Sequence, residues 1–322
     1  MFQIILPYEQ VHWLPLVRMM QRALNEVGVR EVESPLNKRS FILAARCARK
    51  FRLLRLLQLP SREAAFCQMI HPNGLELFPF SFCHRCVTYS FDCFEPQYPS
   101  WEKLFRNSRI NCAFLSAKMS VEAMKKRLPT MRFEWLPEAV DPAEFSFEKP
   151  LAERRLDVLE LGRRSPHYHA AIRNALRKEQ RTHVFEQDGT LLFPLPKRAA
   201  MLETYADSKI TICFPCSITH PARSGTTETA TARYFEAMAS KALIVGHCPA
   251  ELKDLFGYDP VISVNWDNPA RQLCNELLPR IANYQDLVER NYQKLLQVGT
   301  FRLRARRIIE VLSHLESPAA AT

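Results

Sequence analysis

Glycine is scarce in this sequence, with 8 glycines among 322 residues, whereas proline is plentiful at 22. Neither G-x-G-x-x-G nor G-x-x-x-x-G-K-[ST] occurs, which argues against a dinucleotide fingerprint and a P-loop. H-E-x-x-H and D-x-D are also missing, and a D-x-D pair would indicate a diphosphate held through a metal ion. We therefore expect any phosphate ligand to be held by arginines and a helix N-terminus, without a metal or other cofactor.

Long apolar runs are missing as well. None approaches the ~18 residues that a membrane-spanning helix needs. The first six residues, MFQIIL, resemble a first β-strand and lack the basic region and cleavage site of a signal peptide. These features predict a cytoplasmic protein.

Acidic residues are fewer than basic ones, 34 against 44, and the formal net charge is +10. This charge indicates an anionic partner without choosing between nucleic acid, membrane and phosphorylated substrate. No nucleic-acid reader motif accompanies it, so we expect no nucleic-acid partner. Residues 38–57 combine apolar side chains with a run of basic ones: Lys38, Arg39, Arg46, Arg49, Lys50, Arg52 and Arg55. Each basic residue near an anionic bilayer contributes ~1 kcal/mol to membrane binding, so residues 38–57 predict peripheral membrane binding. A solvated helix beside an acidic acceptor site is the open alternative.

Ten cysteines are scattered along the chain, mostly in apolar stretches. Two C-x-x-C pairs, Cys83/Cys86 and Cys213/Cys216, have a spacing that suits zinc. The two pairs are far apart in the sequence, and Cys213 ends an apolar segment that resembles a buried strand. Ordinary core thiols are therefore the favoured interpretation, with structural zinc as the alternative.

Short apolar strands alternate with helical segments through most of the chain, which is typical of βαβ units with parallel sheets. A polar, proline-bounded stretch interrupts the pattern in the middle. We predict an α/β protein with two Rossmann-like domains facing a cleft. The predicted boundaries are an N-terminal Rossmann-like domain at 1–140, a linker at 141–155, a C-terminal Rossmann-like domain at 156–300, and a C-terminal helix and tail at 301–322 that return toward the first domain.

The stretch from Arg223 to Ser240 carries the clearest chemistry. Thr226 or Thr227 would cap a helix, with Glu228 in its first turn and Glu236 eight residues on, ~12 Å further along the axis. Two carboxylates so spaced could accept hydrogen bonds from a sugar and a ribose, while free N–H groups at the helix start receive a diphosphate. The competing interpretation is a capping Glu228 and a solvated Glu236.

This segment resembles the Glu-x7-Glu signature of glycosyltransferase family 4, the retaining GT-B enzymes. Glu236-Ala237-Met238-Ala239 and the following Ala242–Gly246 are similar to the rest of the motif, although Lys241 stands where the family has glycine. The resemblance implies that Glu228 contacts the donor sugar and Glu236 the ribose. The loop residues Ser224, Gly225, Thr226 and Thr227 would complete the donor-binding site.

Arginine and aspartate positions complete the candidate site. Arg163 and Arg164 follow the first strand of the second half, and the resemblance implies that an arginine there grips the donor diphosphate; a surface patch is the alternative. Asp92 follows a strand of the first half, where the family often has a sugar-contacting residue, although Asp92 could equally cap a turn. Residues 7–10 lack the glycine-rich loop of the family, and no acceptor site can be assigned from them.

The resemblance implies a retaining, hexosyltransferase-like enzyme that moves a sugar from a nucleoside diphosphate donor to an acceptor hydroxyl. In that mechanism the leaving diphosphate can take the acceptor proton, so no protein base is required. The resemblance suggests surface polysaccharide or glycolipid synthesis as the setting, and a protein or a small molecule as the acceptor is the open alternative. The alternative is a GT-B-like protein that binds a nucleotide sugar without catalysis.

Overall fold

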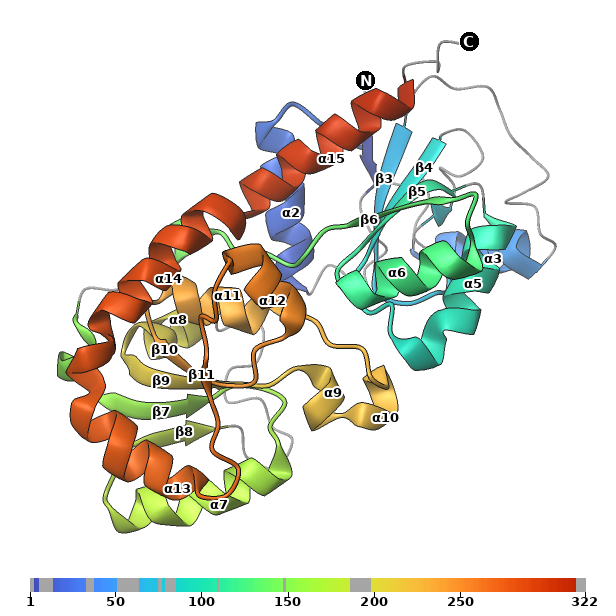
Figure 1. The fold of residues 1–322 in the computed structure, drawn as a ribbon. Coiled ribbons are helices and arrows are strands. Elements are labelled where there is room, and N and C mark those ends of the chain that lie inside the picture. Colours follow the sequence, from blue (N-terminus) through green and yellow to red (C-terminus); the bar gives the residue numbers. More distant parts are fainter. Residues whose placement is uncertain are drawn as a thin grey trace. The chain divides into compact units, whose positions relative to one another are not determined.

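The computed structural model describes residues 3–5, 14–32, 38–50, 64–74, 77–78, 85–108, 110–146, 149–185 and 198–316. The chain divides into two compact units (Figure 1). One comprises Met1–Pro137 with Phe301–Thr322, and the other Glu138–Thr300. The predicted linker, 141–155, lies within the second unit and contains the 3-10 turns η4 (Pro142–Glu144) and η5 (Leu151–Glu153).

The first unit is built on a six-stranded sheet in the order β2-β1-β3-β4-β5-β6, with parallel pairing throughout. Its strands are β1 (Gln3–Ile5), β2 (Arg30–Val32), β3 (Ala64–Met69), β4 (Arg85–Ser90), β5 (Ile110–Leu115) and β6 (Arg132–Trp135). Its helices are α2 (Pro15–Glu26), α3 (Lys38–Lys50), α5 (Tyr98–Asn107), α6 (Lys118–Arg127) and α15 (Phe301–Glu316), with the 3-10 turn η3 (Glu95–Gln97).

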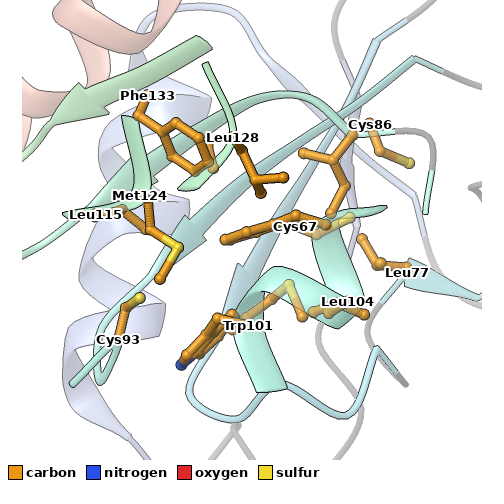
Figure 2. Close-up of a cluster of buried hydrophobic side chains, with 14 of the residues drawn as sticks. Cys67, Leu77, Cys86, Cys93, Trp101, Leu104, Leu115, Met124, Leu128 and Phe133 are labelled. Atoms are coloured by element: carbon orange, nitrogen blue, oxygen red, sulfur yellow. The ribbon is translucent and has the colours of Figure 1, made fainter. Parts of the chain in front are cut away.

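One apolar cluster of this unit lies between the sheet and helices α5 and α6. Every residue of β3 is buried, which is the pattern of a central parallel strand covered on both faces. Trp101 and Leu104 from α5 and Met124 from α6 pack with Leu115 and Phe133 of the sheet (Figure 2). The helices therefore attach to the sheet through their apolar side chains.

The C-terminal helix α15 packs against α2, so the end of the chain returns to the first unit as predicted (Figure 1). Arg304 on α15 is buried, and its Nε donates to the Pro137 carbonyl at 2.8 Å. Helix α2 begins with Pro15 and ends before Gly28, whose φ of 87° is the left-handed conformation expected of a terminating glycine.

The second unit has a five-stranded parallel sheet in the order β11-β10-β9-β7-β8. Its strands are β7 (Leu156–Glu160), β8 (His183–Phe185), β9 (Ser208–Cys213), β10 (Leu243–Gly246) and β11 (Ile262–Ser263). Its helices are α7 (Pro166–Lys178), α8 (Arg198–Ala206), α9 (Cys216–Thr219), α10 (Pro221–Ser224), α11 (Ala232–Ala239), α12 (Ala250–Phe256), α13 (Pro269–Arg271) and α14 (Gln285–Val298), with the irregular turns η7 (Gln272–Leu277) and η8 (Leu278–Tyr284).

Helices cover both faces of this second sheet. Val158 packs in one apolar cluster with residues of α7, η7 and η8, whereas its neighbour Leu159 packs in another with α11, α12 and α14. Successive strand residues point to opposite faces, so each cluster marks one covered face. The predicted α/β class with two Rossmann-like parts is confirmed.

The basic segment predicted to bind membranes is only partly described. Lys38–Lys50 form α3, whereas residues 51–57 lie outside the described residues. Within the part of the chain that the structure describes, no helix has both the length and the apolar character to cross a bilayer. Peripheral membrane binding stays a prediction.

Candidate functional site

The candidate site of the second unit is built on loops at one edge of its sheet. Strands β7, β9 and β10 are parallel neighbours, so their carboxyl ends meet at the same edge. Residues 161–165 follow β7, residues 214–231 connect β9 to α11, and residues 247–249 follow β10. Most of the residues predicted to bind a donor lie on these loops.

Helix α11 begins at Ala232, so the prediction of a helix starting at Thr226 or Thr227 is wrong. Residues 227–231 form a loop instead. Threonine recurs through this loop, and β-branched residues favour extended backbone over helix. Glu228 therefore lies before the helix rather than in its first turn, and the predicted spacing of the two carboxylates along one helix axis does not apply.

Carboxylates from elsewhere in the unit accept hydrogen bonds from backbone N–H groups at the start of α11 and just before it. The Ala232 N–H donates to Glu138 Oε2 at 2.6 Å, and the Ala230 N–H donates to Glu251 Oε1 at 2.6 Å. Glu138 and Glu251 are both buried. An anionic side chain at a helix N-terminus is favourable, but it takes the place that we expected a diphosphate to fill. The Ala232 N–H is therefore not free for a diphosphate, and binding of a phosphate by the arginines stays a prediction.

Glu228 faces a histidine that the sequence did not single out. Its Oε1 lies 3.0 Å from His247 Nε2, and the two side chains are 29% and 39% exposed. His247 directly follows β10, and its backbone N–H donates to the Cys213 carbonyl at 3.1 Å. The histidine is therefore fixed to the sheet and can orient the Glu228 carboxylate. Its place immediately after an apolar strand was the signal that could have identified it.

Glu236 lies on α11 and is largely enclosed, with 12% of its side chain exposed, so the interpretation as a solvated residue is wrong. Tyr205 donates its hydroxyl to Glu236 Oε2 at 3.4 Å, and Arg198 Nη1 lies 3.8 Å from Oε1. Burial raises the pKa of Glu236, while Arg198 and Arg233 oppose that rise. A carboxylate held in this way keeps accepting capacity for the hydroxyls of a ligand.

Arg163 lies on the loop after β7, half-buried beside Gly162, whose φ is 72°. Its Nη1 donates to Cys216 Sγ at 3.5 Å, which joins the loops that follow β7 and β9. Nearby, the pKa of His220 is lowered by burial and by the charges of Arg163, Arg223 and Arg233. Three cations acting on one imidazole indicate a positive potential that suits an anion.

The loop from α9 to α11 contains the other predicted donor-binding residues. Gly225 has a φ of 58° and a ψ of −133°, a backbone conformation open to glycine and strained for other residues. Ser224 and Thr227 are buried and Thr226 is exposed. The Ser224 hydroxyl donates to the His220 carbonyl at 3.4 Å, so this serine shapes the loop.

Arg164 belongs to a different cluster from Arg163. Its guanidinium lies 5.1 Å from the centre of the Phe185 ring, and its Nη1 is 3.4 Å from His169 Nε2. His169 Nδ1 in turn contacts Glu160 Oε2, which His183 Nε2 also approaches at 2.9 Å. Burial acts to raise the pKa of Glu160, but the hydrogen bonds from the two histidines outweigh it and the pKa is lowered.

Glu160, His169 and His183 form the group of ligand-type side chains, among the described residues, that is compact enough for a metal ion. Zinc accepts such donors. However, a guanidinium can only donate, so His169 Nε2 accepts from Arg164 and its Nδ1 carries a proton toward Glu160. Zinc-bound histidines usually donate their second N–H to an acceptor. The cluster therefore fits a buried, hydrogen-bonded carboxylate better than a metal centre.

The C-x-x-C pairs are only partly described, because Cys83 lies outside the described residues. Cys213 and Cys216 are both buried. Burial raises the pKa of the Cys213 thiol to about 12, which keeps it protonated, and Cys216 Sγ accepts from Arg163. The interpretation of this pair as core thiols agrees with these contacts.

Two further predicted features have clear places. Asp92 is half-buried after β4 in the first unit, where its carbonyl accepts from the Phe94 N–H at 2.9 Å. Lys241 adopts a φ of 50°, and the bonds from Lys241 N–H to Met238 and from Ala242 N–H to Ala237 form a Schellman ending to α11. Lys241 thus adopts a left-handed backbone conformation that glycine adopts more readily.

No family model matches this sequence, and no curated protein matches it. Solved structures, however, resemble it over most of its length. The N-terminal domain of Candida albicans trehalose-6-phosphate phosphatase aligns with a TM-score of 0.59 at 9% identity, covering 97% of this chain and 96% of that one. The E. coli trehalose-6-phosphate protein bound with UDP-2-fluoro glucose aligns with a TM-score of 0.54 at 11% identity, covering 87% of this chain and 77% of that one. A trehalose-6-phosphate synthase studied for glycosyl transfer with retention gives 0.57 at 12%, covering 96% and 84%.

The fold is GT-B. At these identities the likeness shows the fold alone, and fold does not fix chemistry.

Proposed function

We propose that this chain is a glycosyltransferase that takes a sugar from a nucleoside diphosphate donor bound in its second unit. The observation that carries the proposal is the enclosed Glu236 carboxylate on a loop-and-helix segment that also carries Glu228, beside the cationic loop of Arg163. Neighbours of the same fold include a protein bound with UDP-2-fluoro glucose. Carboxylates for hydroxyl groups and arginines for phosphates match the two chemical parts of such a donor.

Each residue has a role set by its surroundings. Glu236 would accept hydrogen bonds from the ribose, because its carboxylate is enclosed and its position on α11 is fixed by packing. Arg163 would bind the diphosphate through its planar fork of N–H donors. Glu228 is more exposed and would contact the transferred sugar, with His247 orienting its carboxylate. Asp92, in the first unit, stays a candidate for the acceptor side.

The reaction would break the bond between the anomeric carbon and the diphosphate oxygen and form one to the acceptor oxygen. Positive charge on Arg163 would stabilise negative charge as it develops on the leaving diphosphate. The acceptor oxygen would attack on the face from which the diphosphate leaves, so the configuration would be retained. The leaving diphosphate oxygen would take the acceptor proton, so no protein base would be needed. A hexosyl donor and an acceptor in surface polysaccharide or glycolipid synthesis are the finer parts of the proposal.

The two glutamates provide the test. Glu236→Ala should weaken binding of the bare nucleoside diphosphate and raise the donor KM. Both changes should be equivalent to ~1.5–3 kcal/mol in free energy, the scale of a hydrogen bond to a charged group. Glu228→Ala should lower kcat strongly and leave affinity for the bare nucleotide almost unchanged, because it acts on the sugar. Calorimetry with UDP, GDP, CDP, ADP and dTDP and kinetics with the corresponding sugar donors would measure both effects.

Circular dichroism must first show that both variants are folded. If both bind nucleotide and turn over like the wild type, the proposed site is wrong. If the wild type binds nucleotide but neither transfers nor hydrolyses any donor, the chain is instead a non-catalytic nucleotide-sugar-binding protein of GT-B fold.

A further inference from the structure

Arg233 connects two parts of the candidate site that are distant in sequence. It lies in the first turn of α11, three residues before Glu236. Its Nη1 donates to the Arg163 carbonyl at 3.3 Å, a contact across 70 residues. One side chain therefore joins the helix of the enclosed carboxylate to the loop of the arginine that would bind phosphate.

Gly162 is where the Arg233 side chain comes close to the backbone of this loop. A Cβ atom at position 162 would lie 2.0 Å from Arg233 Nη2 and 2.4 Å from Cζ. The guanidinium thus occupies the space that a side chain of residue 162 would need. Because the φ of Gly162 is also 72°, glycine serves both the turn and the close approach of Arg233.

Charge is the second consequence of this position. Residues three apart on a helix are neighbours on its surface, so Arg233 lies beside Glu236. The charged and titratable groups facing that carboxylate are Arg198 and Tyr205 from α8, Arg233 from α11 and Glu144 from η4. Burial and Glu144 raise the pKa of Glu236, whereas the two arginines and the Tyr205 hydroxyl oppose the rise.

We propose that Arg233 is a positioning residue of the donor site, which holds the Gly162–Arg163 loop through the Arg163 carbonyl and places a positive charge beside the Glu236 carboxylate. This inference rests on the proposed function, because it assigns Arg233 to the binding of a nucleoside diphosphate. It predicts two separable effects when Arg233 is changed. The loop of Arg163 loses its tie, and Glu236 takes up a proton at higher pH.

The experiment compares Arg233→Gln and Arg233→Lys with the wild type, using whichever of UDP, GDP, CDP, ADP and dTDP binds the wild type. Calorimetry between pH 5 and pH 8 measures the dissociation constant. Arg233→Gln should weaken binding roughly tenfold at pH 8. The pH below which binding fades should also move upward, because the protonated carboxyl is a poorer acceptor. Arg233→Lys keeps the charge, so the pH below which binding fades should stay near the wild-type value. Its affinity for the nucleotide should nevertheless fall.

Two matched controls separate this role from general effects. Arg177→Gln removes the same charge from an exposed position on α7 and should leave binding and its pH dependence unchanged. Gly257 has a φ of 79° with no atom near its Cβ position, so Gly257→Ala introduces backbone strain without touching Arg233. Gly162→Ala should weaken nucleotide binding, whereas Gly257→Ala should lower only the stability.

A purely structural role would lower the melting temperature of Arg233→Gln without changing the pH below which binding fades. That result would overturn the inference. Wild-type affinity in Arg233→Lys would also overturn it, and this variant carries the test should Arg233→Gln not fold. If the wild type binds none of the five nucleotides, the proposed function fails and the inference with it. If the wild type binds and Glu236→Ala does not, but Arg233→Gln binds normally, the inference alone fails.

Discussion

Replacing Glu236 by glutamine should stabilise the unliganded protein while weakening its binding of nucleotide. Burial raises the pKa of Glu236 above the value of an unfolded glutamate, so ionisation near neutral pH disfavours the folded state. The favourable contribution of the protonated form is present below the unfolded pKa and is lost as pH rises through the folded pKa. Glutamine does not ionise, so a variant with glutamine at this position does not lose that stability as pH rises.

The expected magnitude follows from the contacts of the carboxylate. Each pKa unit of the rise corresponds to ~1.4 kcal/mol at alkaline pH. Against this, glutamine has one acceptor oxygen where Glu236 offers two, to the Tyr205 hydroxyl at 3.4 Å and to Arg198 at 3.8 Å. Loss of one such long contact costs about 0.5–1 kcal/mol. Each 1 kcal/mol of net gain in the free energy of unfolding corresponds to roughly 2–4 °C in melting temperature for a unit of this size.

The assay is thermal unfolding of Glu236→Gln and wild type from pH 4 to pH 8. The difference in melting temperature should be smallest near pH 4, about the pKa of an unfolded glutamate, and should grow in favour of the variant as pH rises. Nucleotide affinity should fall about 10- to 150-fold in the same variant. Glu276→Gln, at an exposed position, is the control and should show neither trend.

A difference that stays flat with pH, or that favours the wild type more as pH rises, would refute the argument about burial. Greater stability with unchanged nucleotide affinity would refute the ribose-binding role of Glu236 and leave the electrostatic argument intact. The combination that we expect, a more stable but weaker-binding variant, is the trade-off typical of functional sites.

Two other predictions concern the helix end and the phosphate site. Lys241→Ala should lower the free energy of unfolding, measured by chemical denaturation, by about 1–2 kcal/mol. The variant keeps the left-handed backbone but loses the Glu289 ion pair at 2.6 Å and the Tyr292 ring contact at 4.7 Å. Lys241→Gly should cost less, since glycine adopts this φ without strain; an alanine variant as stable as the glycine variant would contradict this. Donor turnover should survive excess EDTA, because arginines are expected to hold the diphosphate; loss of activity that Mg²⁺ or Mn²⁺ restores would show that assignment to be wrong.

The strands were predictable because inner strands of parallel sheets are apolar on both faces. Strand β3 is an example, because all six of its residues are buried. The edge strand β2, with the sequence Arg-Glu-Val, was missed because two of its three residues are charged. Its pairing with β1 depends on backbone hydrogen bonds, which leave no hydrophobic pattern.

The sequence by itself determined the alternating α/β architecture, the segment that carries Glu228 and Glu236, and the position of Arg163 after a strand, because local periodicity and motif spacing encode these features. Only the tertiary structure decided where α11 begins and what surrounds its carboxylates. Glu138 reaches the Ala232 N–H across 94 residues, and Arg233 reaches the Arg163 carbonyl across 70. Contacts across such separations form when the strands pair, so nothing in the local sequence predicts them.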